Sequence, residues 1–74
     1  MKTTELSRIE KLEKKYYRPL FQFAEDLCGD PVKAMVLTQR TFRLAFDYSR
    51  NFPIPTNKHA WLSTLLFDRY LTAA

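Results

Sequence analysis

The sequence predicts a compact all-α domain of three or four helices. Apolar side chains recur at steps of three and four along most of its 74 residues, which is typical of helices with one buried face. No strand pattern and no internal repeat accompanies them. The composition is 46% hydrophobic and 15% aromatic, which favours a packed core over a disordered segment. A chain of this length forms one domain at most, so we expect residues 1–74 to fold as a single unit.

A first helix is expected over about residues 4–28. Pro19 lies inside it, removes one backbone hydrogen bond and crowds the preceding turn, so we expect a kink or a short break there. The apolar pattern resumes after Pro19 in the same phase, which favours a kink. The side chains of its apolar face are Leu6, Ile9, Leu12, Tyr16, Leu20, Phe23 or Ala24, and Leu27.

The tripeptide Gly29-Asp30-Pro31 predicts the end of this helix and the start of the next. Glycine suits the left-handed residue after a helix, aspartate suits an N-cap, and proline suits the first helical position. The second helix is expected over about 31–48. Its inward side chains are expected to be Ala34, Leu37 or Thr38, Thr41, Phe42, Ala45 and Tyr48.

A loop is expected over residues 49–56, because Pro53 and Pro55 bias the residues before them toward extended backbone. Thr56 or Asn57 is then expected to cap a last helix over about 57–72. The apolar side chains of that helix include Ala60, Trp61, Leu62, Leu65 and Leu66.

The sequence offers little that could support catalysis, a metal site or a cofactor. Cys28 and His59 are the only cysteine and histidine, they fall on different helices, and neither has a neighbour that would make it a nucleophile or base. We expect Cys28 to be a small buried apolar group and His59 a surface or cap residue. A single glycine excludes a phosphate-binding loop. We expect no enzyme, no metal and no cofactor. We also expect a cytoplasmic setting, since no signal sequence or membrane span is present.

Charge is distributed unevenly. The net charge of +4 comes largely from residues 38–74, where five basic side chains face only Asp47 and Asp68. This half is the one more suited to a polyanion, although +4 also serves simply to keep a small protein soluble. The basic side chains are Arg40, Arg43, Arg50, Lys58 and Arg69.

Two groups of residues are candidate binding sites. Val32, Met35 and Val36 lie on the side of the second helix away from its expected core, so they form either a partner-binding patch or a surface covered by the first helix. The loop carries an aromatic residue among cations and amides, a combination that suits single-stranded nucleic acid. In the alternative, Phe52 closes the loop over the core. The loop candidates are Arg50, Asn51, Phe52, Asn57 and Lys58.

A series of short motifs and single residues follows one order along about residues 9–66. They are Tyr16-Tyr17-Arg18-Pro19-Leu20-Phe21, Phe23-Ala24, Leu27, Gly29-Asp30-Pro31, Ala34, Leu37, Gln39, Thr41-Phe42, Ala45, Phe52 and Ala60-Trp61-Leu62. Their order and spacing resemble region 2 of extracytoplasmic-function (ECF) sigma factors of bacterial RNA polymerase.

The resemblance implies a helical domain that binds RNA polymerase and promoter DNA without catalysis of its own. The second helix would dock on the clamp helices of the beta-prime subunit, with Gln39, Arg40 and Arg43 facing polymerase beside the apolar patch. The loop and last helix would help melt the −10 element and hold a flipped base of the non-template strand. Trp61 would anchor the last helix in the core.

Several positions depart from the family pattern. The family carries carboxylates on the second helix where this chain has Val32, Lys33, Met35, Val36 and Arg40, and those carboxylates face basic groups on the clamp. Near the end, Phe67-Asp68 replaces a common Arg-Asn pair. The alternative function is therefore a diverged sigma-like domain that binds another protein without melting a promoter. Its partner would be an anti-sigma protein, a partner sigma chain or a second copy.

Overall fold

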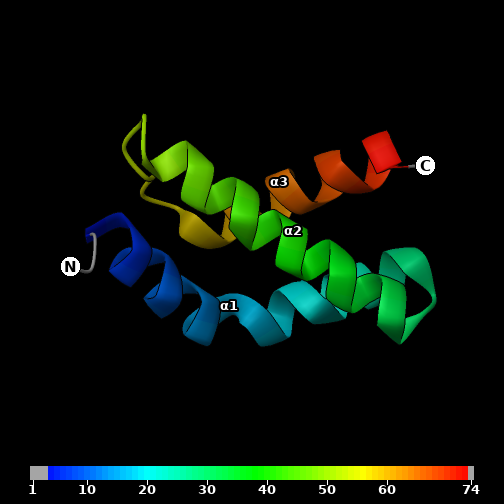
Figure 1. Ribbon diagram of the computed structural model, residues 1–74. Helices are drawn as coiled ribbons and strands as arrows, with labels where there is room; N and C mark the ends of the chain where they lie inside the picture. Colours follow the sequence, from blue (N-terminus) through cyan, green and yellow to red (C-terminus); the bar gives the residue numbers. More distant parts are fainter. Residues whose placement is uncertain (1–3, 74) are drawn as a thin grey trace.

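The computed structural model describes residues 4–73, and all three helices it contains are assembled around one core, as expected for a small all-α domain. They are α1 (Thr4–Cys28), α2 (Pro31–Ser49) and α3 (Lys58–Ala73). Figure 1 shows α2 running between the other two helices, and the α1–α2 contact is the most extensive of the three. The observed bounds differ from the expected ones by one residue at the end of α2 and at each end of α3.

The first helix passes through Pro19 without interruption. The expected alternative of a break is therefore wrong. Figure 1 shows α1 as an arc rather than a straight rod, with its concave side toward α2. Its buried side chains are Ile9, Leu12, Leu20 and Ala24. The expected contribution of Leu6 lies outside the side chains that the structure describes.

The junction between α1 and α2 is built as the tripeptide predicts. Gly29 adopts a left-handed conformation with a φ of 68°, and its N–H donates to the Glu25 carbonyl at 2.8 Å. The Asp30 carboxylate accepts the N–H groups of Val32 at 2.8 Å and Lys33 at 3.5 Å, which caps α2. Because these contacts satisfy otherwise unpaired backbone groups, the chain reverses direction within three residues.

Helix α2 buries a stripe of small side chains against its neighbours. Ala34, Thr38, Thr41 and Ala45 are fully buried, and small residues allow helices to approach closely. The hydroxyl of Thr38 donates to the Ala34 carbonyl at 2.7 Å, and that of Thr41 donates to the Leu37 carbonyl at 2.8 Å. Each of these two buried hydroxyls therefore has an acceptor. A buried hydroxyl without one would destabilise the fold.

Tyr48 is a correction to the expected core. Its side chain is 36% exposed, and Ser49 is buried in its place. The hydroxyl of Ser49 donates to the Phe46 carbonyl at 2.8 Å at the end of α2, so a polar side chain is accommodated there. Tyr48 instead lies at the edge of the core, where the loop returns toward α3.

The Asp30 cap makes a direct contribution to stability that can be measured. We expect Asp30→Ala to lower the free energy of unfolding by about 1 kcal/mol, because two N–H groups of α2 lose their acceptor. Urea denaturation followed by circular dichroism measures this change. Asp26→Ala, which removes an exposed carboxylate one turn earlier, is the matched control and should cost less. Equal losses in both variants would contradict the capping role.

Candidate functional site

The α2 outer face is the first candidate surface. It consists of six exposed residues on the side opposite the buried stripe, and three of them are apolar. Val32 is 64% exposed, Met35 40% and Val36 36%, so α1 does not cover the patch. All the sequence-predicted partner residues are therefore solvent-accessible on one helix. The six are Val32, Met35, Val36, Gln39, Arg40 and Arg43.

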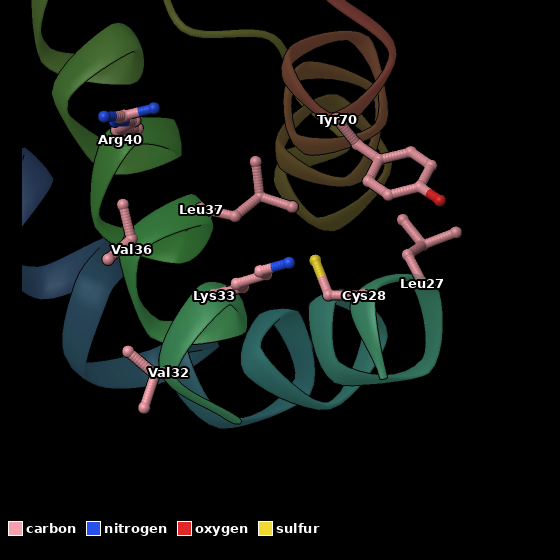
Figure 2. Close-up of a pocket in the computed structure, with 8 residues that line it drawn as sticks. All are labelled: Leu27, Cys28, Val32, Lys33, Val36, Leu37, Arg40 and Tyr70. Atoms are coloured by element: carbon pink, nitrogen blue, oxygen red, sulfur yellow. The ribbon is translucent and has the colours of Figure 1, made fainter. Parts of the chain in front are cut away.

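Two hollows flank Val32 at the beginning of α2. The larger, which we call the Tyr70 groove, has a volume of about 480 Å³ and lies between α2, the end of α1 and the end of α3 (Figure 2). Its lining residues are Leu27, Cys28, Val32, Lys33, Val36, Leu37, Arg40 and Tyr70. The smaller hollow, of about 400 Å³, lies on the α1 side and is lined by Tyr17, Phe21, Pro31, Val32 and Met35. Val32 thus forms a ridge between two apolar depressions.

The Tyr70 groove combines an apolar lining with positive charge. Lys33 and Arg40 are its charged residues, and both are exposed. Arg43 extends the positive charge one turn further along α2. Among the residues that line this groove there is no carboxylate. The surface therefore suits a partner that is apolar and acidic.

The second candidate surface is an aromatic cluster at the other end of α2. Phe52 is 57% exposed, and its ring centroid lies 5.1 Å from that of Tyr48. Tyr48 in turn lies 5.3 Å from Trp61 on α3, with an angle of 56° between the ring planes. These distances are typical of interacting aromatic pairs. Phe52 thus packs against Tyr48 at the edge of the loop and yet presents most of its ring to solvent.

The polar residues of the loop have different roles. Arg50 and Asn51 are exposed. The Arg50 guanidinium lies 5.8 Å from the Phe46 ring, and the Asn51 amide donates weakly to the Asp47 carbonyl at 3.4 Å. The Asn57 side-chain oxygen accepts the Ala60 N–H at 3.1 Å, which makes Asn57 the cap of α3. Lys58, at the start of α3, is half-buried.

Tyr48 is the site residue that sequence reasoning missed. Helical spacing predicts a core position for it, while the structure makes it the middle ring of the cluster. A signal was available in the sequence, because Phe52 follows Tyr48 by four residues. The N–H groups of Asn51 and Phe52 both donate to the Tyr48 carbonyl, at 3.0 and 2.9 Å, which holds the loop close to this ring.

Neither Cys28 nor His59 has surroundings typical of a catalytic residue. Cys28 is half-buried in the Tyr70 groove, and His59 is exposed with its ring 5.9 Å from Tyr16. In the part of the chain that the structure describes, no three histidine, cysteine or acidic side chains come together as a metal site. Over the same residues, none of the helices is both long and apolar enough to cross a bilayer.

Comparison of the chain with protein families, with curated proteins and with solved structures gave no match.

Trp61 provides a test of the aromatic cluster, because it is the only tryptophan of the chain. We expect Tyr48→Ala to shift its emission to longer wavelength, since the indole loses a covering ring and gains water. Fluorescence of the folded variant measures this shift. Tyr70→Ala, which truncates a tyrosine in the groove at the far end of α3, should leave the emission unchanged. A shift of the same size in both variants would argue against the cluster.

Proposed function

We propose that this chain is a sigma region-2-like domain that acts in bacterial transcription initiation by binding, not by catalysis. In this proposal the loop aromatic cluster holds bases of the non-template strand of the promoter −10 element. The α2 outer face docks on the beta-prime clamp helices of RNA polymerase. The domain would work in the cytoplasm, and polymerase would supply all of the chemistry.

The exposed aromatic cluster is the observation that supports this proposal most directly. Bases of single-stranded DNA stack on aromatic rings, while neighbouring cations neutralise phosphates. The Phe52 ring is largely open to solvent and packs against Tyr48, which in turn packs against Trp61. The exposed Arg50 precedes Phe52 by two residues in the loop. A supported ring loses little freedom when a base stacks on it, which favours binding.

The α2 outer face supports the polymerase half of the proposal through its shape. An apolar ridge at Val32 and two flanking hollows can receive apolar side chains from a pair of helices. Gln39, Arg40 and Arg43 are exposed further along the same helix, where the resemblance assigns polymerase contacts.

A second candidate function is a diverged sigma-like module that binds another protein and does not melt promoters. The charges of α2 favour it, because Lys33 and Arg40 occupy positions where the family carries carboxylates facing basic groups of the clamp. Like charges brought together at an interface weaken binding. The partner would then be a regulator, a partner sigma chain or another copy.

The DNA-binding half is tested by truncating Phe52. We expect Phe52→Ala to weaken binding of a single-stranded −10 oligonucleotide by ~1–3 kcal/mol, because one base loses its stacking surface. Fluorescence anisotropy at low and moderate salt measures the affinity. Phe67→Ala is the matched control, since Phe67 is also an exposed phenylalanine but lies on α3 beside Tyr70. Equal affinities of the parent and the folded Phe52 variant would refute base stacking at this site.

The polymerase half is tested by calorimetric titration of a purified clamp-helix fragment. We expect the combined substitution Met35→Glu and Val36→Asp, which restores carboxylates on the α2 outer face, to strengthen binding to the basic groups of the clamp. Sedimentation of the same variant checks self-association, which it should reduce if copies meet through this patch. Absence of clamp binding by both proteins, each shown to be folded, would leave the second candidate function.

A further inference from the structure

We propose that the Tyr70 groove is a docking site for an acidic amphipathic helix of another protein. The inference rests on the second candidate function, protein binding through α2, and names the class of partner. It is independent of DNA binding, because the loop cluster lies at the other end of α2. Val32 and Tyr48 are separated by 16 positions of one helix, which corresponds to about 24 Å.

The lining of the groove provides an apolar contact from all three helices. Figure 2 shows Lys33 and Leu37 extending from α2 toward the side where Cys28, Leu27 and Tyr70 lie. Leu27 and Tyr70 are half-buried, so each retains apolar surface that a partner can cover. A volume of about 480 Å³ is in the range of specific binding pockets and is open to receive side chains from a docked helix.

The spacing of the two cations indicates the shape of the partner. Lys33 and Arg40 are seven residues apart on α2, so they lie on the same side two turns apart, at about 10.5 Å along the axis. Val36 and Leu37 fall one turn from each of them. A partner helix with carboxylates at i and i+7 and apolar residues at i+3 and i+4 matches this pattern, because it has the same repeat.

A second copy of this chain fits the groove less well. The chain carries a net charge of +4, and Arg43 adds a third cation next to Lys33 and Arg40 on the face concerned. A symmetric contact through this face would bring like charges together. Nucleic acid matches the charges but not the apolar lining. The acidic helix is the occupant that matches both properties.

The test uses a helically constrained peptide with Glu at i and i+7 and Leu at i+3 and i+4, together with the same peptide carrying Lys in place of Glu. Cys28 is the only cysteine and lines the groove, so the rate at which iodoacetamide alkylates its thiol reports occupancy. We expect the acidic peptide to bind and slow alkylation at least fivefold at saturation, while the basic peptide does neither.

A charge-matched pair of variants tests the role of the two cations. Lys33→Gln with Arg40→Gln should weaken binding of the acidic peptide about three- to tenfold, as expected for two exposed ion pairs. Lys11→Gln with Lys14→Gln removes the same charge from exposed positions of α1, about 20 Å along the helix from the groove, and should have no such effect.

Three outcomes of the peptide experiment, and a fourth with the clamp-helix fragment, would overturn the proposal. The three are equal binding of both peptides, binding of the acidic peptide without protection of Cys28, and protection of Cys28 by a single-stranded oligonucleotide instead of the peptide. Binding of the clamp-helix fragment in place of the acidic peptide would refute this partner class while preserving protein binding by α2. Phe52→Ala should leave peptide binding intact, because Phe52 lies at the other end of α2. Peptide binding and DNA binding can therefore fail independently.

Discussion

The burial of one stripe of α2 against both neighbouring helices is the constraint on which the rest of the structure depends. Ala34, Thr38, Thr41 and Ala45 are fully buried because their small side chains let α1 and α3 approach. A larger residue at any of them would separate the helices and leave voids elsewhere in a small core. The opposite face of α2 carries no such constraint. Its side chains can change charge and polarity while the fold is maintained.

The sequence predicts features that depend on neighbouring residues, and it does not predict features that depend on how distant segments pack. The helix junction at Gly29-Asp30-Pro31 depends on backbone preferences and one capping side chain, so the sequence alone located it within a residue. Helical spacing also places Val32 on the side of α2 away from the core, but it does not decide whether α1 covers that side. The position of Tyr48 depends on the path by which the loop returns to α3, and periodicity carries no information about that path. The Tyr70 groove was likewise unpredictable, because it forms only when the ends of three helices meet.

The two candidate surfaces differ in chemistry because they form at different ends of α2. At its beginning, apolar side chains and two cations line a groove together, an arrangement that suits a protein helix. At its end, three aromatic rings pack at tilted angles where the helix leads into the loop, and the exposed ring among them suits planar bases. Since α2 is one continuous helix, it holds the two surfaces at a fixed separation. A partner at either end would leave the other accessible.

Charge on α2 discriminates between partners more than it determines affinity. An exposed ion pair contributes up to about 1 kcal/mol, whereas burial of a side chain such as Val32 contributes ~1.5–3 kcal/mol. The apolar ridge can therefore support docking of helices in general. Lys33 and Arg40 then favour an acidic helix over a basic one, because they attract the carboxylates of the first and repel the cations of the second. A fold of this kind can acquire a new partner by changing exposed charges alone, since none of those residues supports the core.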